Sequence, residues 1–398
     1  MRIKFAAVVA FVIAFSGLVL VQGRSTLDIY AIDAEGGKAT LYVSPSGESL
    51  LLDAGSGGGR DATRIVEAAR QAGLTQIDYM LVTHYDGDHV GGVKDLADRF
   101  PIKHFVDYGP RQPVPTAPAP TPAQLEAMAR STDVYMSAVN TVPAANHLVL
   151  KAGDALPIKG IDVQMVSSKA TVLTKALADG GKPNPLCGQF KPHPVDTTEN
   201  YNTLGMVVSA FGRFRALDLG DLTWNLENKL VCPNNLLGTV DLYMVTHHGL
   251  ARSSEPVMVA SVAPRVAIMN NGPRKGGAVE TWDTLRATKT IQDVWTLHYS
   301  EERPLSANFE EQADPGGPKY NAPEQFIANL DRTPAPPPAP ATPAPAQGGP
   351  GGARGPQVPP HVPAYLIKVS VRPDGSFTIT NTRNGFSKEY PAGQRRTN

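Results

Sequence analysis

The sequence lacks several features that would by themselves indicate a class of protein. It has only two cysteines, Cys187 and Cys232, and neither lies in a metal-binding motif, which argues against thiolate metal ligands. Its 37 basic residues offset 37 acidic ones, so no overall charge draws the chain to nucleic acid. No apolar segment after residue 21 could span a membrane, so the chain cannot form a multispan channel, and no internal repeat is evident.

The first 23 residues predict a signal peptide. A charged start, Met1-Arg2-Ile3-Lys4, precedes an apolar core at 5–21, and Val21-Gln22-Gly23 resembles a small-residue cleavage site. The core is only just shorter than a membrane span, so an uncleaved N-terminal anchor is the alternative. Either form predicts an exported protein, periplasmic or extracellular. In an oxidising compartment Cys187 and Cys232 would pair, with two free thiols as the alternative.

The main signal for function follows a buried strand predicted at 77–82. The segment Thr83 to His89 holds two imidazoles and two carboxylates, from His84, Asp86, Asp88 and His89. A loop that leaves a strand end can direct alternate side chains to one point, and divalent metals favour this mixture of nitrogen and oxygen donors. The alternative, a solvated turn, explains four donors at this spacing poorly.

Three further motifs also follow predicted strands. His247-His248-Gly249 comes after the apolar run 241–246, Gly220-Asp221 after 214–219, and Asp53-Ala54-Gly55 after 49–52. The His247-His248-Gly249 cluster strengthens the case, whereas Gly220-Asp221 and Asp53-Ala54-Gly55 alone are weak turn signals. Their order along the chain, together with the segment Thr83 to His89, indicates one site assembled from several strand ends.

These motifs resemble the metallo-β-lactamase superfamily, and within it the hydrolase domain of ComEC/Rec2-type competence proteins. The general superfamily motif is His-x-His-x-Asp-His, whereas this chain has the variant His84-x-Asp86-x-Asp88-His89. Asn202-Thr203-Leu204 resembles the Asn-Ser-Leu of the competence group, and the resemblance covers roughly residues 26–300. The opening turn departs from the group with Glu35-Gly36-Gly37-Lys38 in place of the usual Gln and Asp. Leu250 stands where a serine is expected.

The resemblance implies an α/β fold, the metallo-β-lactamase-like αββα sandwich, over residues 26–332 with an insertion around 110–200.

Alternating patterns predict a helix from a capping Asp61 to about Ala72, with Ile65, Ala68 and Ala69 on its inner face. Residues 333–363, rich in Pro, Ala and Gly, predict a linker. Residues 364–391 predict a C-terminal β-hairpin that docks on the main sheet, because an isolated hairpin is unstable.

The resemblance also implies two divalent ions, Zn²⁺ or Mn²⁺, and a role for each motif residue. His84 and Asp86 would hold one ion, with Asn202 as a weak third partner. Asp88, His89 and His247 would hold the other, and Asp221 would bridge the two. His248 would then be free to hold or protonate the substrate, so that Asp88 and His248 are the predicted catalytic residues. Asp53 would orient the ligand histidines.

Three other residues could reach the site. His193 could replace the histidine that the Asn202 motif lacks, or be a solvated loop residue. His298 and Tyr299 end a predicted strand and could approach the metals, or pack at the sheet edge.

The predicted function is an exported hydrolase that uses metal-bound hydroxide. The substrate would be a phosphodiester or other phosphate ester, either a small molecule or of the nucleic-acid type. Cleavage of a lactone, amide or β-lactam is one alternative, and a non-catalytic exported metal-binding module is another. No feature of the sequence indicates an oligomeric state.

Overall fold

The computed structural model describes residues 24–112, 121–300, 318–330 and 364–393. The predicted signal peptide or anchor and the predicted linker at 333–363 lie outside the described residues. Within the described ranges, no helix is long and apolar enough to cross a membrane.

The first sheet has nine strands in the order β20-β19-β18-β1-β2-β3-β4-β5-β6. They are β1 (Leu27–Ala31), β2 (Thr40–Val43), β3 (Ser49–Leu52), β4 (Ile77–Leu81), β5 (Ile102–Asp107), β6 (His147–Val149), β18 (Ile367–Val371), β19 (Phe377–Asn381) and β20 (Ser387–Tyr390). Strands β3, β4, β5 and β6 run parallel to one another, so their carboxyl ends lie at one edge.

The second sheet also has nine strands, with β9 attached to β8 and the remaining order β17-β16-β15-β14-β12-β11-β8-β7. They are β7 (Ala155–Leu156), β8 (Asp162–Ser168), β9 (Thr171–Val172), β11 (Gly205–Ala210), β12 (Phe214–Asp218), β14 (Leu242–Met244), β15 (Val266–Met269), β16 (Asp293–His298) and β17 (Ile327–Asn329). A separate short pair joins β10 (Lys182–Pro183) to β13 (Asn234–Asn235).

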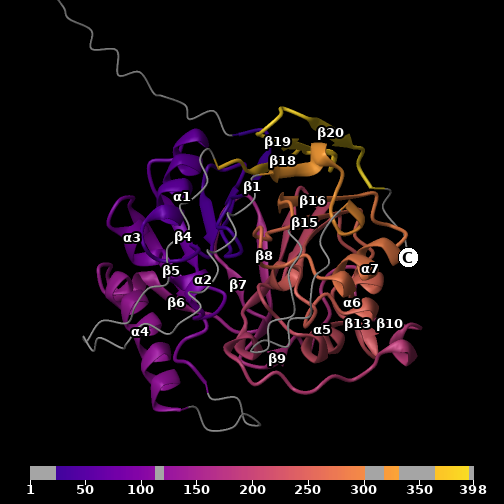
Figure 1. The fold of residues 1–398 in the computed structure, drawn as a ribbon, viewed down its shortest axis with the longest axis horizontal. Helices are drawn as coiled ribbons and strands as arrows, with labels where there is room; N and C mark the ends of the chain where they lie inside the picture. Colours follow the sequence, from indigo (N-terminus) through magenta and orange to yellow (C-terminus); the bar gives the residue numbers. More distant parts are fainter. Residues whose placement is uncertain (1–23, 113–120, 301–317, 331–363, 394–398) are drawn as a thin grey trace, which may run out of the picture.

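Helices cover the outer faces of the two sheets, which gives the predicted αββα sandwich (Figure 1). On the side of the first sheet lie α1 (Arg60–Gln71), α2 (Gly87–Val90), α3 (Val93–Ala97) and α4 (Pro122–Val139). On the side of the second lie α5 (Trp224–Val231), α6 (Pro256–Val262) and α7 (Val279–Ala287). Strands such as β3 and β14 are continuous apolar runs because both of their faces are buried.

Helix α1 begins differently from the prediction. Its N-cap is Gly59, in a left-handed conformation, and Asp61 lies inside the first turn. The Asp61 carboxylate accepts a hydrogen bond from the Ser56 N–H at 2.7 Å, so the predicted capping role was wrong. The predicted inner face is confirmed, since Ile65, Ala68 and Ala69 are buried.

The C-terminal segment forms three strands, one more than the predicted hairpin. β18 and β19 make the hairpin, β20 adds to it, and β18 pairs antiparallel with β1. The Trp295 Nε1–H of β16 donates to the Tyr390 hydroxyl at 3.0 Å, which links β20 to the second sheet. The C-terminal strands therefore extend one sheet and contact the other.

The region around 110–200 contributes to both sheets. Its strands β6, β7 and β8 belong to the main sheets, so only part of this region is an addition to the sandwich. The structure pairs Cys187 with Cys232, which ties the loop around Cys187 to the end of α5.

Candidate metal centre

The predicted motifs meet where strands of the two sheets end. Asp53 follows β3, and the segment Thr83 to His89, called here the metal loop, follows β4, its parallel neighbour. Asp221 follows β12 in the second sheet. The turn Thr246–Gly249, called here the histidine turn, follows β14, which is parallel to β12. Parallel pairing brings the strand ends of each sheet together, and the packing of the two sheets brings the two edges face to face.

Four side chains form a compact cluster of potential metal ligands. One donor atom from each of Asp88, His89, Asp221 and His248 lies within 4.8 Å of the other three. Asp221 Oδ2 is 3.2 Å from Nε2 of both His89 and His248. Asp88 Oδ2 is 3.4 Å and 3.3 Å from the same two nitrogens. Two carboxylates and two imidazoles thus face a common point.

In the metal loop, hydrogen bonds fix the orientation of both imidazoles. The His89 Nδ1–H donates to Asp53 Oδ2 at 2.8 Å. The Thr83 hydroxyl donates to the same carboxylate at 2.8 Å, so it must accept at 3.0 Å from the Nδ1–H of His84. Both rings therefore carry a proton on Nδ1 and direct Nε2 into the site, the orientation that a metal ligand needs.

The histidine turn shows the same arrangement with different partners. His248 Nδ1 lies 3.1 Å from the Asn270 carbonyl oxygen, which can only accept. His247 Nδ1 lies 3.1 Å from the Ser253 hydroxyl, which donates its own proton to the Leu222 carbonyl oxygen at 2.8 Å. All four motif histidines are therefore held through Nδ1, which leaves Nε2 as the nitrogen available to an ion or a substrate.

The electrostatics of the cluster favour charged carboxylates. Burial would raise the pKa of Asp221, but His248, His89 and His247 lower it well below its usual value. The pKa of Asp88 is also held well below normal, because His89 and Lys275 outweigh burial. Burial lowers the pKa of His247 to about 3, so its imidazole is neutral.

Near the cluster, two more donors surround a second position. His84 Nε2 lies 3.6 Å from Asp86 Oδ2, and the side chain of Asp86 is 41% exposed. Among the described residues, His84 Nε2 and Asp221 Oδ1 are buried polar atoms without a hydrogen-bond partner. Buried polar atoms left in this way are costly, which fits a site meant for an ion.

The structure gives the two neighbouring histidines different surroundings. His248, expected to be free for the substrate, belongs to the four-residue cluster. His247, expected to be the ligand, lies 3.5 Å from Asp221 Oδ2 by its Nε2 and 3.3 Å from the Asn200 amide nitrogen. Sequence spacing could not decide between adjacent residues whose side chains diverge in a left-handed turn.

Asn202, the predicted weak partner of the ion at His84 and Asp86, has its amide nitrogen engaged elsewhere. That nitrogen donates to the Gln112 carbonyl oxygen at 2.9 Å and to Glu199 at 3.3 Å. Asn200, which the sequence did not single out, lies beside His247.

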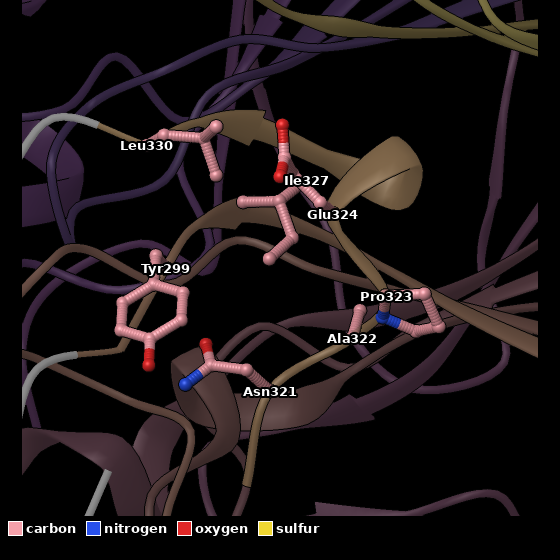
Figure 2. A pocket seen from close by; sticks show the side chains of 7 residues that line it. All are labelled: Tyr299, Asn321, Ala322, Pro323, Glu324, Ile327 and Leu330. Carbon is pink, nitrogen blue, oxygen red and sulfur yellow. The ribbon is translucent and has the colours of Figure 1, made fainter. Parts of the chain in front are cut away.

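The other candidate residues also lie elsewhere. His193 is exposed and packs on Trp224. His298 is buried, with its Nε2 2.7 Å from Asp33 Oδ1. Tyr299 lines a different pocket, shown in Figure 2, together with Asn321, Ala322, Pro323, Glu324, Ile327 and Leu330.

One residue at the site was missed by sequence reasoning. Lys275 lies in the loop between β15 and α7, and its Nζ is 2.5 Å from Asp88 Oδ2. The available signal was a lysine between glycines, Gly272 and Gly276-Gly277, just after a buried strand. That pattern is too common to have identified it.

Comparisons with known proteins agree with the motif analysis at the superfamily level. Residues 32–133, which include Asp53 and the metal loop, match the family described as Metallo-beta-lactamase superfamily. A 65-residue stretch is 38% identical to "Lactamase-like protein notP" from Aspergillus sp. (strain MF297-2). This stretch covers 16% of the chain and only 20% of that relative. These matches support the superfamily and give no evidence for the ComEC/Rec2 subgroup.

Solved structures with some similarity include metallo-β-lactamases. The subclass B3 enzyme MEM-A1 from a soil metagenome library is 14% identical, with a TM-score of 0.31 over 57% of this chain and 78% of that one. Rm3 metallo-β-lactamase is 15% identical, with a TM-score of 0.31 over 68% and 82%. A metallo-β-lactamase with a HARLDQ motif from Cronobacter sakazakii is 14% identical, with a TM-score of 0.27 over 48% and 60%.

Proposed function

We propose that this chain is a metal-dependent hydrolase of phosphate esters, with phosphodiesters as the leading substrates. The observation that carries the proposal is the common orientation of His84, His89, His247 and His248. Each imidazole is held through Nδ1, and Asp221 lies within 3.5 Å of three of the Nε2 atoms. A set of buried imidazoles that served only packing would not need this shared orientation.

The donors divide into two groups around Asp221. Asp88, His89 and His248 would hold one divalent ion, His84 and Asp86 would hold another, and Asp221 would serve both. Bound divalent ions supply Lewis acidity and lower the pKa of a water molecule to about 7. Asp53 and Thr83 keep the metal-loop imidazoles in place, and Ser253 and the Asn270 carbonyl do so for the histidine turn.

His247 is the imidazole that remains for the substrate. Because burial keeps it neutral, its Nε2 can accept a hydrogen bond rather than donate one. Asn200, 3.3 Å away, would position the same part of the substrate. This assignment replaces the role first given to His248.

Phosphate esters fit the donor set better than neutral substrates do. Three carboxylates, from Asp86, Asp88 and Asp221, make a harder ligand set than an all-histidine site, and hard oxygen donors suit Mn²⁺ as well as Zn²⁺. Within the superfamily, the ComEC/Rec2-like variant motif points the same way.

The test uses the purified full chain, stripped with a chelator and reconstituted with Mn²⁺ or Zn²⁺. Reporters would include a phosphodiester, a phosphomonoester, a lactone and a β-lactam. We expect turnover of the phosphodiester that the chelator abolishes and added metal restores. Preferred turnover of the lactone or β-lactam would move the function to that class. A folded, metal-loaded protein that turns over no reporter would be a binding module.

We also propose that the protein is exported. The proposal rests on the residues 1–23, and the Cys187–Cys232 disulfide supports it, because such bonds persist in oxidising compartments. Fractionation of the native host with an antibody to the chain would test it, and recovery from the cytoplasm with free thiols would contradict it.

A further inference from the structure

We propose that Lys275 binds the anionic group of the substrate beside the ion held by Asp88, and so selects phosphate esters over neutral lactones, esters and amides. This inference rests on the hydrolase function proposed above and names the residue that selects its substrate class.

Lys275 places a full positive charge at the edge of the donor cluster. Its Nζ is 2.5 Å from Asp88 Oδ2, and that oxygen is also within 3.4 Å of His89 Nε2 and 3.3 Å of His248 Nε2. A lysine ammonium is a full positive charge in its ordinary state, and this one lies against the carboxylate that faces both imidazoles.

The fold holds Lys275 in this place. Gly36 of the opening turn has a φ of 93°, and a Cβ at that position would lie 2.8 Å from Lys275 Cβ. The Lys275 carbonyl oxygen accepts from the Gly272 N–H at 2.8 Å, and the Gly277 N–H donates to the His248 carbonyl oxygen at 3.2 Å. The lysine stem therefore passes between the opening turn and the histidine turn. The unusual Glu35-Gly36-Gly37-Lys38 turn provides the space that this passage requires.

The ammonium is accessible to a substrate. The side chains of Lys275 and Asp88 are 33% and 29% exposed, so both reach the solvent-facing side of the cluster. An ammonium has three N–H donors, whereas its contact with Asp88 uses a single carboxylate oxygen. When that oxygen binds an ion, Lys275 needs another anionic partner, and a substrate oxygen at the same ion can supply it.

The charge balance of the site favours an anion. The carboxylates of Asp86, Asp88 and Asp221, together with one hydroxide, would balance two divalent ions, so the Lys275 ammonium adds one uncompensated positive charge. A neutral lactone or amide leaves that charge uncompensated, whereas a phosphodiester neutralises it. Lysine is a compact point charge and a common partner of phosphate oxygens.

The experiment compares the full chain with Lys275→Met and Lys275→Arg, all loaded with Mn²⁺. The matched control is Lys94→Met, which removes an exposed lysine paired with Asp98 on α3. The first readout is calorimetric binding of inorganic phosphate. We expect Lys275→Met to weaken it about 10- to 100-fold, the loss of one charge-assisted hydrogen bond. Lys275→Arg, which keeps the charge, should retain most of the affinity, and Lys94→Met should change nothing.

Two further readouts separate substrate binding from a structural role. Metal content by elemental analysis should be unchanged in Lys275→Met. The kcat/KM for bis(4-nitrophenyl) phosphate should fall by the same factor as phosphate affinity, and that for neutral 4-nitrophenyl acetate should fall much less. If Lys275→Met does not fold, Lys275→Gln, which keeps a polar tip, takes its place.

Unchanged phosphate binding, or an equal fall for the charged and neutral reporters, would overturn the proposal for Lys275. Loss of metal from both Lys275→Met and Lys275→Gln would overturn it too, since Lys275 would then support the metal centre itself. Failure of the hydrolase proposal looks different. The wild-type chain would turn over no reporter, while phosphate binding that depends on Lys275 would persist.

Discussion

The metal loop and the histidine turn supply the same chemistry with opposite backbone requirements. In the metal loop, Asp86 is in an extended conformation at φ −72° and then caps the short helix α2. In the histidine turn, His247 and His248 both have left-handed backbones, with φ values of 56° and 55°. Such conformations cost on the order of 1–3 kcal/mol for each residue and persist only where the surroundings impose them.

Backbone hydrogen bonds from neighbouring loops hold the histidine turn in this conformation. The His247 N–H donates to the Gly220 carbonyl oxygen at 2.9 Å, and the Gly249 carbonyl oxygen accepts from the Ala278 N–H at 2.8 Å. The histidine turn is thus hydrogen-bonded to the loops that carry Asp221 and Lys275. The metal loop thus has an ordinary backbone conformation, whereas the histidine turn keeps its left-handed conformation through contacts with neighbouring loops.

The largest effect is expected where the metal loop and the histidine turn meet. Asp221→Ala should remove most metal binding and lower turnover by orders of magnitude, because Asp221 Oδ2 faces His89, His247 and His248. Elemental analysis after reconstitution measures the loss. His104→Ala, outside the motifs, is the control and should bind metal normally. Full occupancy in Asp221→Ala would show that the metal loop and the histidine turn bind metal independently.

The partners that orient the imidazoles should differ in importance. Asp53→Asn should weaken metal binding about 10- to 100-fold, since a carboxylate orients His89 from one side. Ser253→Ala removes only a neutral hydroxyl from His247, so its effect should be smaller. Competition with a chromogenic chelator would measure both. A larger loss in Ser253→Ala would place His247 among the essential ligands.

Metal affinity should rise with pH. Burial would lower the pKa of His89, but Asp221, Asp53 and Asp88 raise it well above its usual value, so the metal-free imidazole keeps its proton to a higher pH than a free histidine does. A metal must displace that proton, and the affinity should grow about tenfold per pH unit for each proton released, up to the pKa of His89. Calorimetry in buffers of different ionisation enthalpy would count the protons. An affinity independent of pH between 6 and about 8 would contradict this.

Glycine substitutions can separate backbone strain from crowding. Gly276 and Gly47 have φ values of 85° and 89°, but a Cβ at Gly276 would collide with the His248 carbonyl oxygen, whereas nothing lies within 4 Å of one at Gly47. Gly47→Ala should cost about 1–2 kcal/mol of stability with activity unchanged. Gly276→Ala should cost more and also lower activity by displacing the histidine turn. Denaturant unfolding and reporter kinetics would distinguish them, and matching losses would argue against the close support of the turn.

The smallest effect on the site is expected from the disulfide. Replacing both Cys187 and Cys232 by Ala should lower the free energy of unfolding by about 2–4 kcal/mol, because the bond closes a long loop. Metal content should stay the same, since neither residue contacts a motif. Loss of metal in the double variant would show that the loop around Cys187 supports the centre.

The sequence alone predicted the strands that carry the candidate site, and its resemblance to the superfamily predicted the sandwich. Apolar runs at β3, β4, β12 and β14 indicated buried strands, so the polar residues that follow them were expected at strand ends. His84, Asp86, Asp88, His89 and Asp221 were predicted in this way, because residue type and position relative to a strand are features of local sequence. The order of the motifs was enough to suggest the superfamily.

Tertiary structure decided which residues occupy each place around those strand ends. His247 and His248 are neighbours of the same type, so only the left-handed turn and its partners Ser253 and Asn270 give the two rings different surroundings. Asn200 lies beside His247 through a contact between distant loops that local sequence does not indicate. Lys275 reaches Asp88, 187 positions away in sequence, because Gly36 leaves room for its stem. Local sequence carries strand and turn preferences, but contacts between distant loops depend on how the two sheets pack.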